Sequence, residues 1–217
     1  EFRGKGILKY MRDMHRDGEV SKQMTLFLLG DGESGKTSVV KALKSPTNSS
    51  ERLHEDSRTV GIDISTWVTP GGEVEFKVLD LAGQAIYSKT HQLFLQQRAV
   101  YLLVWRAHES LLEDDSELSD RIVHWMESLQ LRVPGSMMLL VATHIDCVSA
   151  NDLDVLCSRV RSVSQHTIAS FQRARNEGVR VLQLFDNGES ARVNCLSGEG
   201  VVGLRNKLTM FAMTAPW

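Results

Sequence analysis

The chain has 217 residues, of which 42% are hydrophobic and 24% are charged, so it has the composition of a globular domain and can bury a substantial core. Its formal net charge is −2 and its longest apolar run, residues 99–105, is too short to cross a bilayer, so we expect neither a nucleic-acid partner nor direct membrane insertion. The three cysteines form no C-x-x-C pair, which argues against a disulfide framework or a zinc site and favours a reducing, cytoplasmic location.

Two apolar patterns of different period open the chain. Ile7, Met11 and Met14 fall on one helical stripe within residues 1–20, which we interpret as an N-terminal linker or helical segment. Residues 24–29 form a continuous apolar run of the length of a strand. We therefore expect residues 21–217 to form one domain that starts with this strand.

A helix, a polar loop and a β-hairpin are predicted next. Residues 38–43 are helix-like, and residues 45–57 are polar and rich in Ser, Asn, Glu and Pro, as in a mobile loop. Residues 62–68 and 74–79 alternate in polarity, and the Pro-Gly-Gly turn between them favours a hairpin.

Buried strands and long helices follow in alternation. Residues 99–105 and 137–142 are short continuous apolar runs, which are typical of strands buried on both faces of a parallel sheet. Apolar side chains at helical spacing mark three further helices: Leu118, Ile122, Met126 and Leu129, before a stop at Pro134-Gly135; Leu153, Leu156, Val160 and Val163, with a possible continuation to Phe171; and Val201, Leu204, Leu208 and Phe211.

An additional strand is suggested at residues 179–185, followed by a turn at residues 186–188 before the chain returns at Arg192. The alternation of β and α elements predicts an α/β fold with a mainly parallel, six-stranded sheet and helices on both faces. In such a fold the ligand lies at the C-terminal ends of the strands.

Residues 30–37 match the phosphate-loop pattern G-x-x-x-x-G-K-[ST] and lie between a predicted strand and a predicted helix, as the pattern requires. Glycines let backbone N–H groups point at phosphate oxygens, and the helix N-terminus adds its positive dipole end. Lys36 can reach the β- and γ-phosphates, and the Thr37 hydroxyl can ligate Mg²⁺. The predicted phosphate-binding residues are Gly30, Gly32, Glu33, Ser34, Gly35, Lys36, Thr37 and Ser38.

A phosphate loop alone fits a kinase, an ATPase or a GTPase, and later residues narrow the choice. Asp80 ends a predicted strand, where a carboxylate can hold Mg²⁺ directly or through water. Gly83 leaves its backbone N–H free to approach a γ-phosphate, and Gln84 is placed to orient an attacking water. Thr59 closes the polar loop and can supply a second hydroxyl to Mg²⁺. We predict Lys36, Gly83 and Gln84 as catalytic residues, and Thr37, Thr59 and Asp80 as Mg²⁺ ligands.

The segment Thr143-His144-Ile145-Asp146 directly follows a predicted buried strand. The carboxylate of Asp146 can accept hydrogen bonds from N1–H and N2–H₂ of guanine, a pair of contacts that adenine cannot make. Asp146 could also cap a helix or close a turn, and it could do both. The segment therefore favours guanine over adenine as the base.

Together these residues resemble those of the small Ras-like GTPases, over nearly the whole chain from Met24 to Phe211. Residues 80–84 are similar to that family's D-x-x-G-Q segment, Gly32 to the phosphate-loop glycine that must stay small for hydrolysis, and residues 59–63 to the Rab-type threonine and the strand after it. Asn194-Cys195-Leu196 is similar to the final base-contacting loop. The resemblance implies a Ras-like P-loop fold and a guanine site formed by Thr143, His144, Asp146, Cys195 and Leu196.

One departure from the Ras pattern is informative. T-H-I-D stands where the guanine motif reads N-K-x-D, and this form is similar to the Roc domains (Ras of complex proteins) of the leucine-rich-repeat kinases and related Roco proteins. The amphipathic residues 6–11 resemble the linker that leaves a leucine-rich-repeat array. The resemblance implies GTP or GDP as ligand, Mg²⁺ as cofactor, leucine-rich repeats before this segment, a COR domain after it, and a possible homodimer.

The predicted function is that of a regulatory GTPase within a larger multidomain protein, with slow turnover of roughly 10⁻⁴–10⁻² s⁻¹. The alternative is a nucleotide-gated dimerisation or scaffold module with little or no hydrolysis. Gln84 and Gly32 favour the enzyme, and the altered guanine motif favours the scaffold. Arg52 and Arg58 could act as an arginine finger in cis or across a dimer, although a solvated loop charge is the better interpretation of each.

Overall fold

The computed structural model describes residues 22–51, 59, 61–81, 95–96, 99–175 and 177–214. Several sequence-based predictions therefore lie outside the described residues: the N-terminal segment 1–20, Arg52, Arg58, Gly83 and Gln84.

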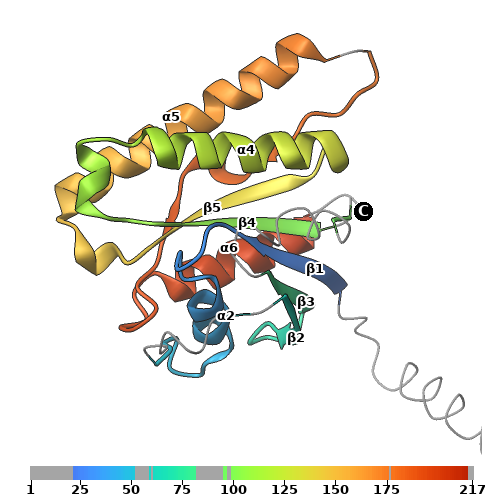
Figure 1. Cartoon of the computed structure of the whole chain (residues 1–217). Coiled ribbons are helices and arrows are strands. Elements are labelled where there is room, and N and C mark those ends of the chain that lie inside the picture. The colour runs from blue at the N-terminus through green and yellow to red at the C-terminus, as the bar shows by residue number, and fades with distance from the viewer. Residues whose placement is uncertain are drawn as a thin grey trace, which may run out of the picture.

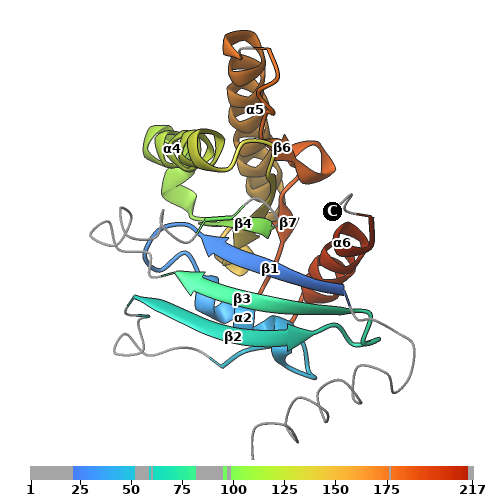
Figure 2. The ribbon, with the colours of Figure 1, turned by 90° about the vertical axis from the view of Figure 1, so that its right-hand side faces the viewer.

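The described strands form one sheet in the order β2-β3-β1-β4-β5-β6, and β7 also pairs with β5. β2 and β3 run antiparallel, and the other pairs are parallel. Figure 2 shows β2, β3 and β1 in this order. The strands are β1 (Lys22–Leu29), β2 (Ile62–Val68), β3 (Val74–Leu81), β4 (Ala99–Arg106), β5 (Met137–Thr143), β6 (Gln183–Leu184) and β7 (Ala191–Arg192).

Helices cover both faces of this sheet. α4 and α5 lie over one face, and α2 and α6 lie against the other (Figure 1). The helices are α2 (Lys36–Lys44), α4 (Ser116–Arg132), α5 (Ala150–Ala174) and α6 (Val201–Thr214), with 3₁₀ turns η3 (Glu109–Leu112), η4 (Ile145–Cys147) and η5 (Phe185–Gly188). No helix in the described part of the chain has both the length and the apolar character that a membrane span needs.

The two faces of the sheet explain the unbroken apolar runs. In β1, Leu26 and Leu28 belong to the core shared with α2 and α6, whereas Phe27 and Leu29 belong to the core shared with α4 and α5. Because successive side chains of a strand point to opposite faces, a strand buried on both faces is apolar throughout. The strands predicted at residues 24–29, 99–105 and 137–142 are confirmed.

The predicted hairpin and the three long helices are also confirmed. In the turn between β2 and β3, the Gly72 N–H donates to the Thr69 carbonyl at 2.8 Å, and Gly72 adopts the positive φ of 77° that a residue with a side chain disfavours. α4 ends before Pro134, and α5 continues past Phe171 to Ala174.

The strand predicted at residues 179–185 is wrong in its extent, because only Gln183 and Leu184 pair with β5. Just before them, the Gln130 side chain of α4 donates to the Arg180 carbonyl at 3.0 Å and accepts from the Leu182 N–H at 2.7 Å. These bonds satisfy backbone groups that a strand would direct to a neighbouring strand.

A left-handed turn then interrupts this edge of the sheet. Asp186 and Asn187 both have φ of 53°, and the chain resumes pairing with β5 only at β7. The sixth position of the predicted sheet is thus shared by two short strands, which gives seven strands among the described residues.

Candidate functional site

The loop between β1 and α2 takes its shape from two glycines. Gly30 has φ of 133°, and a Cβ atom there would lie 2.2 Å from the Val104 carbonyl oxygen of β4, so no side chain fits. Gly35 precedes α2 with φ of 90°, and a Cβ atom there would lie 3.3 Å from Thr143 Oγ1. The loop therefore lies tightly against β4 and the end of β5, where only glycine allows this approach.

Lys36 is buried at the first position of α2. Its ammonium donates to the carbonyl oxygens of Gly30 at 3.0 Å and Asp31 at 2.6 Å. Burial lowers the pKa of Lys36 to about 8, and the nearby Asp80 and Asp31 carboxylates partly oppose this shift. An anion near this ammonium would favour its charged form.

Three oxygen-bearing side chains meet next to Lys36. The Thr37 hydroxyl donates to Asp80 Oδ2 at 2.5 Å and lies 2.9 Å from the Thr59 hydroxyl, which is 3.4 Å from the same carboxylate oxygen. Burial raises the pKa of Asp80, and the Thr37 hydrogen bond and the Lys36 charge partly oppose this. The structure thus brings together the three predicted Mg²⁺ ligands, which lie in three different segments of the chain.

One oxygen of the Asp80 carboxylate is available to a further ligand. Asp80 Oδ1 is buried and has no hydrogen-bond partner among the residues that the structure describes. A buried carboxylate oxygen without a partner is costly, and a hard divalent cation binds to oxygen ligands of this kind. No group of three or more His, Cys, Asp or Glu residues suited to a metal occurs in the described ranges. Mg²⁺ typically takes only one or two protein carboxylates and keeps water and phosphate ligands.

Thr143, at the end of β5, supports the phosphate loop. It is 1% exposed, and its hydroxyl lies 2.6 Å from the Ser34 carbonyl, 3.2 Å from the Trp105 carbonyl and 3.0 Å from His144 Nδ1. A hydroxyl has one proton to donate, and the short distance favours Ser34 as the acceptor. Thr143 thereby links the strand that leads to the predicted base site with the loop that forms the predicted phosphate site.

His144 and Asp146 differ in their surroundings. His144 is half-buried in a left-handed conformation with φ of 54°, and burial, followed by the charge of Arg106, lowers its pKa. Asp146 lies exposed in η4. Its carboxylate is therefore open to a ligand, as the guanine prediction requires.

The loop that carries Cys195 and Leu196 lies beside this segment because β7, which leads into it, pairs with β5. Asn194 Oδ1 accepts from the backbone N–H groups of Leu196 at 2.9 Å and Ser197 at 3.2 Å, so the loop is held by its own side chain. Burial, and to a smaller extent Asp146, raises the pKa of the Cys195 thiol to about 12. The structure thus places the two predicted base-contacting segments next to each other.

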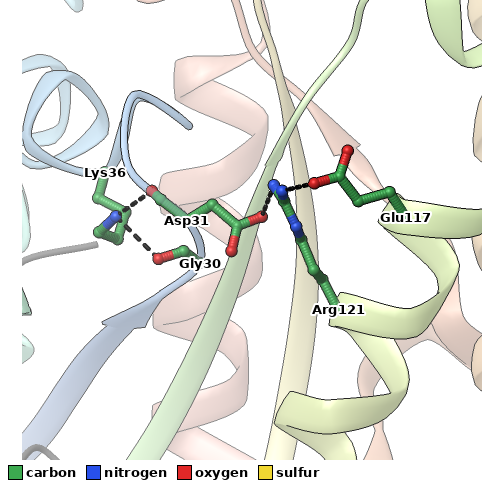
Figure 3. Close-up of polar contacts among 5 residues, drawn as sticks. All are labelled: Gly30, Asp31, Lys36, Glu117 and Arg121. Atoms are coloured by element: carbon green, nitrogen blue, oxygen red, sulfur yellow. Dashed lines mark hydrogen bonds and ion pairs between the residues drawn. The ribbon is translucent and has the colours of Figure 1, made fainter. Parts of the chain in front are cut away.

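Two arginines that the motifs do not identify bond to the segments around the site, one to the phosphate loop and one to the C-terminal end of α2. Arg121 of α4 forms an ion pair with Asp31 of the phosphate loop at 2.9 Å and a second one with Glu117 (Figure 3). Arg205 of α6 donates to the carbonyl oxygens of Ala42, Leu43 and Ser45, at the C-terminal end of α2. Both lie on surface helices, where charged residues are expected, so helical periodicity alone does not distinguish them.

Comparisons with known proteins identify relatives. The family model described as "Ras of Complex, Roc, domain of DAPkinase" matches residues 25–146. The probable serine/threonine-protein kinase pats1 of Dictyostelium discoideum is 28% identical, over 94% of this chain and 6% of that protein. Leucine-rich repeat serine/threonine-protein kinase 1 of Mus musculus is 26% identical, over 93% of this chain and 10% of that protein. The chain therefore spans only a small part of the length of these relatives.

Solved structures agree on the fold. The RocCORdC structure of Methanosarcina barkeri Roco2 bound to GDP has a TM-score of 0.57 and 22% identity, covering 90% of this chain and 50% of that one. The Arl6 BBS3 small GTPase of Trypanosoma brucei with bound GppNp has a TM-score of 0.58 and 18% identity, covering 88% of this chain and 98% of that one. Since the Roc family model matches more than half of the residues, the chain belongs to the Roc family, whose fold is that of the Ras-like GTPases.

Proposed function

We propose that this Roc domain binds GTP and GDP together with Mg²⁺, hydrolyses GTP slowly, and acts as a nucleotide-dependent switch within a larger protein. The observation that carries the proposal is the meeting of the buried Lys36 ammonium with the oxygen cluster of Thr37, Thr59 and Asp80. A cation beside hard oxygen ligands matches the needs of a magnesium–polyphosphate ligand.

Each side chain of the phosphate site has a defined role in this proposal. Lys36 and the backbone N–H groups of residues 32–37 stabilise negative charge on the phosphates. Thr37, Thr59 and Asp80 would hold Mg²⁺, which supplies charge neutralisation at the phosphate oxygens when bound. Gln84 and Gly83 lie outside the described residues, and their roles in orienting water and contacting the γ-phosphate remain proposals from the sequence.

The base would be selected mainly by Asp146. Its carboxylate is exposed, whereas the Thr143 hydroxyl already bonds to the phosphate loop. We infer that Asp146 reads the guanine edge, that His144, Cys195 and Leu196 line the sides of the base, and that Thr143 contributes by fixing the loop rather than by a direct bond.

The relatives support a regulatory role inside a longer chain. Both are named as kinases of much greater length, the Roco2 structure holds GDP, and the small GTPase holds a GTP analogue. We propose that this domain likewise reports its nucleotide state to neighbouring domains, with leucine-rich repeats before it and a COR domain after it, in the cytoplasm.

A nucleotide-gated scaffold with little hydrolysis is the second candidate. One observation favours it: the Thr143 hydroxyl donates to the Ser34 carbonyl, so its proton is not available for a hydrogen bond to the base. In that case nucleotide binding would shift a monomer–dimer balance without turnover. Light scattering with GDP and with a non-hydrolysable GTP analogue measures this shift.

Thermal unfolding of the full 217-residue chain with Mg²⁺ and GDP, GTP or ATP tests nucleotide binding. A ligand at about 100 times its Kd stabilises the protein by about 2.7 kcal/mol, so we expect GDP and GTP to raise the Tm and ATP to have no effect. Removing Mg²⁺ with a chelator should weaken the GTP effect. Equal stabilisation by ATP would contradict a guanine site.

Single-turnover release of phosphate from bound GTP separates the two candidates. The slow GTPase predicts release that follows first-order kinetics, with the Gln84→Leu variant slower than the natural chain. The scaffold predicts intact GTP over the same period, with both chains alike.

A further inference from the structure

The phosphate loop carries a carboxylate where a polyphosphate is proposed to bind. Asp31 is the second residue of the loop, directly after Gly30. Like charges close to each other disfavour binding, so a free carboxylate at this position would oppose the ligand. The structure shows how this carboxylate is held.

Asp31 contacts a cation on each side. Its backbone carbonyl accepts from the Lys36 ammonium at 2.6 Å, and its carboxylate accepts from Arg121 Nη1 at 2.9 Å. Figure 3 shows the carbonyl directed toward Lys36 and the carboxylate directed away, toward α4. The same residue thus connects the phosphate-binding lysine with a helix on the other side of the loop.

Arg121 has a second acidic partner. Its second terminal nitrogen bonds to Glu117, one helical turn earlier in α4, which is the favourable order of an acidic and a basic residue at this spacing. The planar guanidinium presents both nitrogens in a fixed geometry. Arg121 therefore has one acidic partner on its own helix and one in the phosphate loop.

From this geometry we propose that Arg121 is a positioning residue for the nucleotide site, a proposal that rests on the function proposed above. By pairing with the Asp31 carboxylate, Arg121 turns that negative charge toward α4 and fixes the peptide whose carbonyl faces Lys36. Without Arg121, the carboxylate is free to rotate toward the loop, where it repels phosphate and competes for the Lys36 ammonium.

Two simpler roles give different results. In the first, the ion pair only stabilises the fold. The two side chains are 45% and 37% exposed, and an ion pair this exposed adds little to the free energy of unfolding. In the second, Arg121 attracts the phosphates directly through space, and its effect then does not depend on Asp31. A double-mutant cycle separates these roles, because only a role through Asp31 makes the two substitutions non-additive.

The cycle compares four forms of the full chain: the natural sequence, Arg121→Gln, Asp31→Asn and the double variant. The quantity measured is the Kd for a fluorescent GDP in the presence of Mg²⁺. We expect Arg121→Gln to raise the Kd about fivefold at low salt and less at high salt, since the pair is partly exposed. In the Asp31→Asn background the same change should alter the Kd by less than about twofold. The Tm without nucleotide should shift by no more than about 2 °C in each variant.

A matched control is Arg161→Gln, which breaks an ion pair of the same length, 2.9 Å, and similar exposure, 42% and 39%, with Glu189. It should leave the Kd unchanged. An equal loss from Arg121→Gln in both backgrounds, or no loss in either, overturns the positioning role. A natural chain that fails to bind GDP at all would instead overturn the proposed function itself.

Discussion

The phosphate side and the base side of this site are built in different ways. On the phosphate side, Lys36, Thr37 and Asp80 are buried or half-buried and already bonded to the protein. On the base side, Asp146 and Leu196 are exposed, and the described hydrogen bonds of that loop come mainly from backbone groups to Asn194. The phosphate side is thus held in place by the protein, whereas in the proposed function the base is selected mainly by one exposed carboxylate.

This difference shows where the affinity is expected to come from. Buried polar groups that are held in place lose little freedom when a ligand binds, so they contribute strongly. An exposed carboxylate is partly screened by water and contributes mostly to specificity. The two sides are nevertheless linked, because Thr143, which directly precedes the base-side segment, bonds to Ser34 of the phosphate loop.

The largest expected effect is on the phosphate side. Lys36→Ala removes the buried ammonium next to the oxygen cluster and should weaken GDP and GTP binding at least about a thousandfold, since several charge-assisted hydrogen bonds are lost together. A fluorescent-GDP titration measures this. Lys41→Ala, on the exposed side of the same helix, is the control and should bind normally. Wild-type affinity in Lys36→Ala would remove Lys36 from the site.

A change on the base side should alter specificity more than total affinity. Asp146→Asn replaces one acceptor with a donor, which mismatches guanine and suits xanthine. We expect the affinity for GDP to fall about a hundredfold and the affinity for xanthosine diphosphate to rise. Competition between the two nucleotides measures the switch, with the exposed Asp120→Asn as control. Unchanged GDP affinity would mean that guanine is recognised elsewhere.

The pKa of Lys36 predicts a pH dependence that is confined to the phosphate side. Because the pKa is about 8 without ligand and phosphate needs the charged form, GDP affinity should fall above pH 8, by at most about tenfold per pH unit. The same depressed pKa destabilises the ligand-free fold below about pH 8, and this penalty is relieved as the pH rises toward the unfolded value of 10.5.

Affinity measured between about pH 6.5 and pH 9.5 tests this assignment, with Lys36→Arg as the comparison because arginine stays charged throughout. The variant should show a flatter profile, whatever its absolute affinity. An equally steep fall in Lys36→Arg would assign the pH dependence to another group.

The smallest effect is expected from the link between the two sides. Thr143→Val keeps the shape of the side chain but removes the donor to Ser34, so we expect a loss of about 1–2 kcal/mol in the free energy of unfolding and about fivefold weaker GDP binding. Urea unfolding and GDP titration measure both. Thr167→Val removes a comparable hydroxyl bond within α5, to Val163, and should affect stability but not binding. If Thr143→Val also loses stability but keeps its GDP affinity, the hydrogen bond to Ser34 does not support nucleotide binding.

Much of this site could be predicted from local sequence. The phosphate loop is contiguous, and Lys36 bonds to the backbone of the loop itself, so a short motif identifies this part of the site. The partners of Thr37, which are Thr59 and Asp80, come from other segments of the chain. The central strands β1, β4 and β5 are recognisable by their unbroken apolar runs, because both faces of the sheet are covered there. The edge at residues 179–192 was harder to predict, since the Gln130 side chain and two left-handed residues decide where pairing stops.

By itself, the sequence determined the fold class, the order of the central elements and the position of the phosphate loop between β1 and α2, since these depend on periodicity and on short motifs. The tertiary structure alone decided which distant side chains meet: Thr143 with Ser34, Arg121 with Asp31, and Arg205 with the end of α2. The reason is physical. A charged or hydroxyl side chain on a surface helix or at a strand end has the same local pattern whether or not it finds a partner, and only the packing of the sheet and helices brings the partner within hydrogen-bond distance.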